Sequence, residues 1–334
     1  MGRLIENEVM KTLYKKRLQV IAGILFVLIA LFAYGEHYTI TRTQDRVAER
    51  MGVENAANWQ NLLEQQLVDL ERRQENPYIS EEGKASLRVR AEQLQFYLDN
   101  DVNPINSSVA RFMGRFMEQS VFLFLPLLII LLAGDMVSGE VNAGTIKLVL
   151  TRAVPRWKIL FSKLMALVIL EMLVILLMGL IAAIISLVVF RYGGFSEPVI
   201  TGFRLVGDRL DTSFVRTIPQ WQYLLIVYAI GYFVAFVIGC LSLMVSVLVR
   251  STSVSIGIMM SSLIGGSFLS FFIEDWVITR YLYTVNLNLT GFISGSFRMF
   301  EGLSMLFSTS VLLVWSLGAL AVAFAVFTQK DVLA

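Results

Sequence analysis

The stretch over residues 159–190, ILFSKLMALVILEMLVILLMGLIAAIISLVVF, decides the fold of this protein. It is longer than the run of about 20 apolar residues that an α-helix needs to cross the hydrocarbon core of a bilayer. Its charged residues are Lys163, near the start, and Glu171, well inside the run. The stretch therefore predicts a membrane-spanning helix, whose start Lys163 holds at the lipid headgroups together with Arg156 and Lys158.

The composition of the whole chain extends this interpretation. Hydrophobic residues make up 56% of the 334 residues and charged residues 16%, whereas a soluble domain carries about 25% charged residues. Because the apolar residues gather in six long runs, we predict an all-α integral membrane protein with six transmembrane helices. These are expected at residues 18–34, 116–133, 159–190, 221–248, 252–273 and 305–327.

Scarce residue types exclude several classes of function. Cys240 is the single cysteine and His37 the single histidine. A disulfide framework, a thiolate metal site and Ser-His-Asp chemistry are therefore not expected, and we predict no catalytic residues and no metal site. The net charge of +2 is too small to indicate a nucleic-acid partner.

The N-terminal region predicts a retained membrane anchor rather than a signal peptide. The region before the first apolar run is long and contains Glu6 and Glu8, unlike the basic start of a signal peptide. Within residues 1–17, Ile5, Val9 and Leu13 recur at helical spacing. This pattern favours a helix lying in the inner interface, and a solvated tail is the alternative.

Basic residues set the predicted orientation. They cluster in segments that all fall on one side of a six-span topology: residues 1–17, the loop after the second span, Arg250 and Lys330. Because basic loops remain in the cytoplasm, we predict cytoplasmic N- and C-termini. Residues 35–110 are then extracellular and 111–334 hold the five further spans.

Two external segments carry readable patterns. In residues 35–110, leucine-rich stripes at helical spacing flank Pro77, and Ser80 can cap the second stripe, which predicts a helical hairpin. The hairpin could bind a substrate, a partner or a second copy, or serve only as a structural insertion. Between the last two spans, the stretch 286–296 predicts either short helices that dip back into the bilayer or an ordinary surface loop. Residues 191–220 give no clear prediction.

The polar interruption between the second and third spans is the strongest functional signal. Ile146, Val149, Leu150 and Ala153 repeat on one face of a helix, Gly139 and Gly144 interrupt its start, and Pro155 can begin the next helix. On residue pattern alone, this amphipathic segment is either a docking surface for a cytosolic partner or a connector that rests on lipid.

The same segment carries a resemblance to a known family. Gly139-Glu140, Gly144-Thr145-Ile146, Leu148 to Thr151, Pro155 to Leu160 and Lys163-Leu164 resemble the signature of ABC-2-type transporter permeases. Leu248-x-Arg250-Ser251 and Phe327-x-x-Lys330-Asp331 are similar to later family motifs. The chain departs from the pattern at Asn142 and Lys147, where acidic residues are common, and at Ser162, where glycine is usual. The resemblance covers the six-span layout and does not extend to the hairpin predicted within residues 35–110.

This resemblance implies a permease subunit of an ATP-binding cassette exporter in the bacterial plasma membrane. Residues 135–153 would form a coupling helix seated on a cytosolic ATPase subunit. The implied coupling residues are Gly139, Glu140, Asn142, Gly144, Thr145, Lys147, Thr151, Arg152 and Pro155. The chain lacks a G-x-x-x-x-G-K-[ST] phosphate loop, so ATP and Mg²⁺ are expected on the partner ATPase, and this chain is expected to be non-catalytic without a cofactor of its own.

Two features within the predicted spans have open interpretations. Glu171 either lines the translocation pathway or binds a cation, or is protonated or hydrogen-bonded to a neighbouring helix such as the serine-rich fifth span. The fifth span carries two stripes of small residues, which allow close helix packing within the chain or across a dimer. The stripes are Gly257, Ser261 and Gly265, and Ser262, Gly266 and Ser270. The resemblance favours a cavity or a dimer with a second permease, identical or paralogous.

Two other functions remain as hypotheses. The chain could be a membrane sensor or assembly factor with the extracellular hairpin as its input domain. An intramembrane enzyme acting on lipid is disfavoured, because one histidine and one buried carboxylate supply too few paired groups for general acid–base catalysis.

Overall fold

A computed structural model describes residues 1–51, 59–145, 154–206, 209–272, 276–295 and 303–329. In these residues the chain is mostly helical, and five helices are long and apolar enough to cross a membrane. They are α2 (Arg17–Met51), α9 (Arg156–Phe190), α10 (Gln220–Leu248), α11 (Thr252–Phe272) and α13 (Met305–Gln329). The protein is therefore a helical, multi-pass membrane protein, as the apolar runs predicted.

The remaining predicted span is a bent pair of helices, α5 (Val109–Phe122) and α6 (Phe124–Ala133). Their axes differ by 61°, and the pair makes a sixth span only if both helices cross together. Leu123 at the junction leaves the helical region, with φ −132° and ψ −57°. Pro126 lies in the first turn of α6, where proline is tolerated because its N–H would have no intrahelical partner. In a helix continuing unbroken from α5, its ring would clash with the carbonyl of Phe122 and remove one donor, so the proline accounts for the break.

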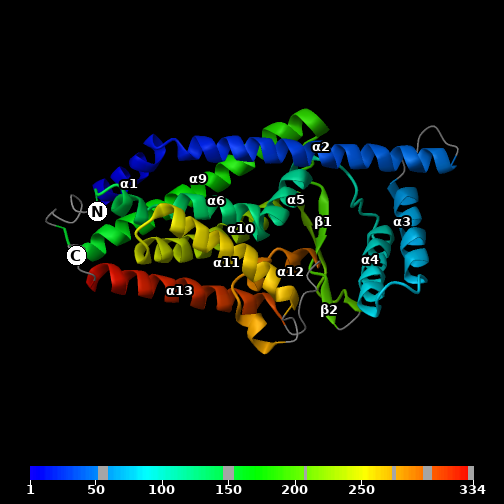
Figure 1. The fold of residues 1–334 in the computed structure, drawn as a ribbon. Coiled ribbons are helices and arrows are strands. Elements are labelled where there is room, and N and C mark those ends of the chain that lie inside the picture. Colours follow the sequence, from blue (N-terminus) through cyan, green and yellow to red (C-terminus); the bar gives the residue numbers. More distant parts are fainter. Residues whose placement is uncertain (52–58, 146–153, 207–208, 273–275, 296–302, 330–334) are drawn as a thin grey trace.

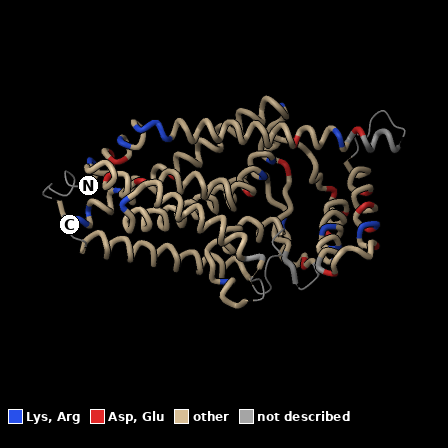
Figure 2. The backbone as a smooth tube through the Cα atoms, viewed as in Figure 1, with Lys and Arg blue, Asp and Glu red and all other residues tan. Residues whose placement is uncertain are grey.

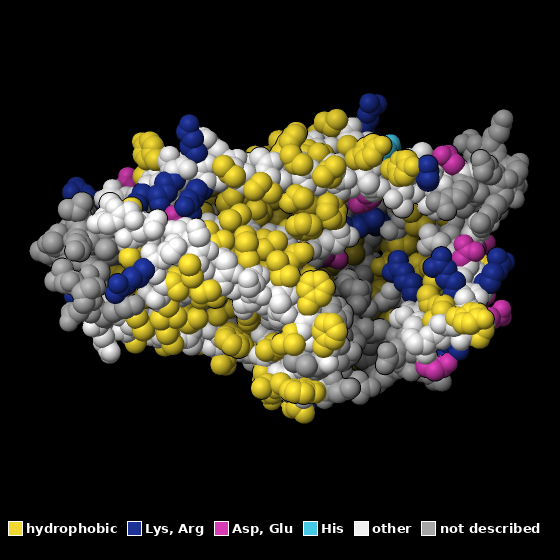
Figure 3. All heavy atoms as spheres, viewed as in Figure 1, with side chains coloured by type: hydrophobic (Ala, Val, Ile, Leu, Met, Phe, Trp, Pro, Cys, Tyr) yellow, Lys and Arg dark blue, Asp and Glu magenta, His cyan; other side chains and the backbone are white. Residues whose placement is uncertain are grey.

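The helices form one elongated bundle, and α1 and the last turn of α13 lie at the same end of it (Figure 1). Helix α10 lies at the centre of the bundle. In its most apolar stretch 61% is buried, more than in the other four long helices, and it contacts α5, α6, α9, α11 and α13. Charged residues gather at the two ends of the bundle, whereas its middle is almost free of them (Figure 2). Hydrophobic side chains cover the visible middle surface (Figure 3). This distribution suits a bundle surrounded by lipid.

At the end near the N-terminus, a short helix precedes the first span. Helix α1 covers Gly2–Tyr14, and Lys16 between α1 and α2 adopts a left-handed conformation with φ 57°. Ile5 and Val9 pack against the main core, whereas Leu13 stays 37% exposed. The predicted helix within residues 1–17 is confirmed, and the structure places it against α9 of the bundle.

The helix of the first span is much longer than predicted. Residues 18–34 were expected, but α2 continues to Met51. The sequence after Tyr34 is polar, but it contains no proline and only one glycine, Gly35, before Met51, so no strong helix breaker ends the helix. Apolar length sets where a helix can lie in lipid and does not set where it ends.

The hairpin predicted within residues 35–110 is present as α3 (Trp59–Gln74) packed against α4 (Glu81–Asp99). The Ser80 side chain accepts a hydrogen bond of 3.2 Å from the Gly83 N–H and caps α4, as its position in the sequence predicted. Leu63 and Leu94 are buried in this pair.

A β-ribbon that the sequence did not predict joins the hairpin to the bundle. Strand β1 (Pro198–Thr201) pairs antiparallel with β4 (Arg216–Pro219), and β2 (Arg204–Val206) with β3 (Arg209–Asp211). Phe203 stacks edge-on against Phe96, with the ring centroids 5.6 Å apart. The Leu210 N–H donates to Glu92 of α4 over 2.9 Å. Strands this short carry little periodic signal, so tertiary contacts decide them.

The segment between α11 and α13 contains the short helices η1 (Val277–Tyr281), η2 (Val285–Leu287) and α12 (Gly291–Ser294). The Asn286 amide donates to the carbonyls of Arg280 and Leu282, each over 2.8 Å, and is fully buried. The region thus contains short helices, whereas their predicted return into the bilayer stays a prediction. Protein covers much of this irregular backbone, as its polar groups require in a membrane protein.

Candidate functional site

A short turn over residues 134–137 connects α6 to helix α7 (Ser138–Asn142), and α7 carries the Gly139-Glu140 pair. The Ser246 hydroxyl of α10 accepts hydrogen bonds from the N–H groups of Val137 and Ser138, over 3.1 and 3.0 Å. These are donors that the start of a helix otherwise leaves unsatisfied. The turn is therefore fixed to the central helix of the bundle.

A buried ion network ties α7 to α1 and α9. Glu140 is 2% exposed, and its Oε1 lies 2.7 Å from the Nζ of Lys163, which is fully buried. The same lysine lies 2.8 Å from Glu8 of α1. Lys11 of α1 also donates to Glu140. Two carboxylates and two ammonium groups thus neutralise one another where three segments meet, which is the condition under which buried charges are tolerated.

A second group of ion pairs lies beside this network. Asp135, just before α7, pairs with Lys15 over 3.0 Å and with Arg17 over 2.5 Å. Arg17 also donates to the carbonyl of Leu131 over 3.2 Å. The junction between α1 and α2 is therefore attached to the junction between α6 and α7.

The position predicted for Lys163 is wrong. The sequence suggested that it anchors the helix start at lipid headgroups, but the structure buries it completely between Glu8 and Glu140. The reason is that α1 folds back over the start of α9 and covers a lysine that would otherwise reach the headgroups. Glu8 and Lys11, 155 and 129 positions from their partners, were not predicted as site residues. The acidic residues within a basic N-terminal segment were the available signal.

The environment of Glu140 predicts how this network responds to pH. Burial by itself raises the pKa of Glu140, but the attraction and hydrogen bonds of Lys163 and Lys11 outweigh it, so that the pKa falls below its ordinary value of 4.5. A carboxyl group whose pKa is lowered by folding stabilises the fold at pH values above its unfolded pKa. This stabilisation is lost as the pH falls below 4.5 through the folded pKa.

We expect the thermal midpoint of the purified protein to be insensitive to Glu140 ionisation near neutral pH and to fall in acid. The comparison is between the wild type and Glu140→Gln, each measured from about pH 7 down to about pH 2, so that the series extends below the lowered pKa. The difference between the two midpoints should shrink toward the acid end. A constant difference would contradict the assignment of the lowered pKa to this pair.

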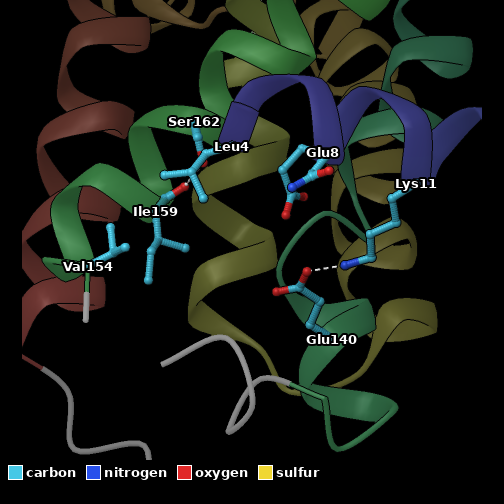
Figure 4. Close-up of a pocket in the computed structure, with 8 residues that line it drawn as sticks. Leu4, Glu8, Lys11, Glu140, Val154, Ile159 and Ser162 are labelled. Atoms are coloured by element: carbon cyan, nitrogen blue, oxygen red, sulfur yellow. Dashed lines mark hydrogen bonds and ion pairs between the residues drawn. The ribbon is translucent and has the colours of Figure 1, made fainter. Parts of the chain in front are cut away.

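An open cavity of about 280 Å³ adjoins the network (Figure 4). Its wall comprises residues of α1, α7 and the start of α9: Leu4, Asn7, Glu8, Lys11, Glu140, Val154, Ile159 and Ser162. The second oxygen of Glu140, Oε2, is buried and has no hydrogen-bond partner among the described residues. In Figure 4 this oxygen points away from Lys11, toward the side where Ile159 lies.

The structure places the predicted coupling residues in two environments. Gly139, Glu140 and Asn142 lie on α7, with Glu140 buried in the ion network. Four of the predicted coupling residues are exposed: Asn142, Gly144, Thr145 and Pro155. Lys147, Thr151 and Arg152 lie outside the described residues. Within the described part of 135–153, a turn and the short α7 take the place of one continuous helix. Gly144, with φ +70°, ends that helix in a left-handed turn.

Glu171 lies fully buried between α9 and α10. Neither carboxylate oxygen has a hydrogen-bond partner among the described residues. The side chain packs against Gly239, where an added Cβ would collide with Oε1. It therefore contacts α10 rather than the fifth span that the sequence suggested. A carboxyl group without a counter-charge in such surroundings is stable only in its neutral form, which favours a packing role.

We expect Glu171→Gln to leave the thermal stability close to that of the wild type, because the amide keeps the size of the neutral carboxyl. Gly239→Ala should destabilise the protein, and Gly239→Ala combined with Glu171→Ala should recover part of the loss. Thermal midpoints of the four proteins, wild type included, make the comparison. A large loss of stability in Glu171→Gln would contradict the packing role of a neutral carboxyl group.

The two small-residue stripes of α11 face different surroundings. Gly257, Ser261 and Gly265 are exposed, and an added Cβ at either glycine would meet no atom within 4 Å. In the other stripe, the Ser262 hydroxyl lies 2.9 Å from that of Tyr283, and Gly266 packs against Thr284. The side chain of Ser270 lies outside the described residues. One stripe therefore packs within the chain, and the other is open.

These features define a multi-pass helical membrane protein with a buried ion network at one end of its bundle. By sequence, the chain belongs to the family described as "Protein of unknown function (DUF2705)", which matches residues 83–333. It is similar to the "Uncharacterized protein YhcI" of Bacillus subtilis (strain 168), with 23% identity over 99% of both chains. It is also similar to the "Uncharacterized membrane protein YdbK" of the same organism, with 26% identity over 64% of this chain and 80% of that protein.

Proposed function

We propose that this chain is the permease subunit of an ATP-binding cassette exporter, and that ATP is hydrolysed on a separate cytosolic subunit. The observation that carries the proposal is the position of α7. The Gly139-Glu140 pair, part of the sequence that resembles ABC-2-type permeases, lies at the end of the bundle where α1 is found. The basic residues at this end favour a cytoplasmic location for it (Figure 2).

The contacts of α7 suit a segment that receives force from a partner. The Glu140 carboxylate connects α7 to Lys11 of α1 and Lys163 of α9. Ser246 connects it to α10, and the neighbouring Asp135 connects it to α2 through Arg17. A displacement of α7 by the ATPase would therefore act on three spans at once. In this proposal the spans alternate between inward and outward openings, or expel the substrate by closing.

The proposal includes a second permease, identical or paralogous, in the plasma membrane. The open stripe of Gly257, Ser261 and Gly265 supports it, because small residues four apart let helices of two subunits approach closely. The exposed hydrophobic side chains Val254, Ile258 and Phe268 flank this stripe. Cysteines introduced along the stripe should form crosslinks between the two protomers. Cys240, the native cysteine, is buried and will react poorly.

Copurification tests the proposal directly. The chain is tagged, solubilised gently from its native membrane and isolated with its bound proteins. We expect a stoichiometric ATPase whose hydrolysis rate depends on the presence of this chain. A complex that repeatedly lacks any ATPase would refute the transport function.

One observation favours a second candidate, a membrane sensor or assembly factor. The hairpin is docked onto the rest of the outer end: Gln93 of α4 donates to the carbonyl of Gly295 over 3.2 Å in a buried position. Phe96 and Tyr97 of α4 also pack with Phe203 of the ribbon. A ligand that displaced α4 would therefore act on the segment between α11 and α13. A complex that contains a signalling or assembly protein in place of an ATPase would support this function.

A further inference from the structure

The cavity beside the ion network is lined by three apolar and five polar or charged side chains, and one of its polar atoms lacks a hydrogen bond. Leu4, Val154 and Ile159 contribute apolar surface, and Glu140 contributes the unpartnered oxygen Oε2. Glu140 is 2% exposed, so this oxygen is almost removed from bulk water. A buried acceptor without a donor costs about 1 to 3 kcal/mol relative to a paired one. The cavity is therefore incomplete as it stands.

We propose that this cavity receives a side chain of the cytosolic ATPase subunit, one with an apolar body and a neutral hydrogen-bond donor at its tip, such as Tyr or Trp. This inference rests on the proposed function, and it adds a second contact to the one made by the exposed residues around Gly144. The donor would bind Glu140 Oε2, and the body would pack against Leu4 and Ile159.

The charges around the cavity select a neutral occupant. Glu8 and Glu140 are already balanced by Lys11 and Lys163, so that a further lysine or arginine would add an uncompensated positive charge. A phosphate group, free or on a lipid, would bring acceptor oxygens to an acceptor that lacks a donor. A neutral donor completes the hydrogen bond and leaves the charge balance unchanged.

The location favours a cytosolic protein partner. The cavity is bounded by α1, by α7, by Val154 and by the first turns of α9, at the end of the bundle where α1 lies (Figures 1 and 4). It shares Glu140 with the ion network. A side chain seated in it would therefore touch the residue that links α1, α7 and α9. Seating and release of that side chain would report the ATPase state to all three.

Cysteine protection tests the proposal in the intact complex. Leu4→Cys lines the cavity, and Glu6→Cys is the matched control, since Glu6 is exposed on the same helix and does not line the cavity. Both variants are treated with a biotin maleimide, with and without the copurified ATPase. We expect the ATPase to slow labelling at Leu4→Cys about tenfold or more and to leave labelling at Glu6→Cys nearly unchanged. Equal labelling of Leu4→Cys in both states would overturn the inference.

The controls separate this inference from the proposed function. If no ATPase associates, the proposed function fails and the inference fails with it. If the ATPase associates and is stimulated while Leu4→Cys stays fully reactive, the inference alone is wrong. Protection in vesicles containing anionic lipid but no ATPase would identify a lipid occupant and would also overturn it.

A photo-crosslinking amino acid in place of Leu4 then identifies the occupant. We expect mass spectrometry to find a crosslinked ATPase peptide centred on a neutral donor side chain. Its replacement by the nearest apolar residue should weaken association about fivefold or more, because Glu140 Oε2 is left unpaired again. Crosslinks confined to lipid, to charged side chains or to this chain would contradict the proposed chemistry.

Discussion

Lys163→Met should destabilise the protein by about 3 to 5 kcal/mol, the usual effect of removing one partner of a buried ion pair. Methionine keeps the length of the side chain but leaves Glu8 and Glu140 without their fully buried counter-ion. The expected result is a lower free energy of unfolding in detergent and a loss of α1 from the bundle. The latter is measured as increased hydrogen exchange in residues 2–14.

Two companion variants test the cause of this loss. Lys158→Met removes a nearby basic residue that contacts Trp157 at a ring distance of 5.5 Å, and it should have little effect. Lys163→Met combined with Glu140→Gln should recover part of the stability, because fewer charges then stay uncompensated. If Lys163→Met were as stable as Lys158→Met, the ion network would not be the element that holds α1.

In the exporter we propose, Gly144→Val should abolish the coupling between ATP hydrolysis and transport while the protein still assembles in the membrane. Gly144 is exposed, has φ +70°, and an added Cβ would meet no atom within 4 Å. The substitution therefore creates no clash. It instead disfavours the left-handed backbone by about 1 to 2 kcal/mol and redirects the chain that leaves α7. We expect at least a tenfold loss of ATPase stimulation by this chain, measured in reconstituted vesicles.

Gly144→Asn is the matched control, since asparagine adopts left-handed conformations far more readily than valine. It should retain most of the coupling and bind the ATPase like the wild type. If both variants lost coupling equally, a side chain at this position and not the backbone turn would be responsible. If both retained it, the coupling assignment of this segment would be wrong. Glu140→Lys is a poorer probe, because it also places a third lysine beside Lys11 and Lys163.

Much of the fold could be predicted from the sequence because its signals are local. The six apolar runs, the cap at Ser80 and the helical stripe with Ile5 and Val9 depend on residues a few positions apart. The resemblance drew attention to Gly139-Glu140 for the same reason, because its motif is contiguous. The length of the apolar runs predicted the membrane environment. The helical form followed, because a backbone in lipid must make all its hydrogen bonds internally.

Only the tertiary structure decided which of these residues form a site. Glu8, Lys11 and Lys163 come together with Glu140 from distant parts of the chain. Each of these charges can be buried only because a residue of opposite charge lies beside it. The same is true of Glu171 against Gly239 and of the ribbon against α4, which no local pattern announces. The sequence by itself determined that the chain is helical and crosses a membrane, because hydrophobicity is a sum over neighbouring residues. The ion network, the cavity beside it and the open face of α11 depend on how the helices pack. The contacts that determine this packing form between residues far apart in the sequence, so no local pattern predicts them.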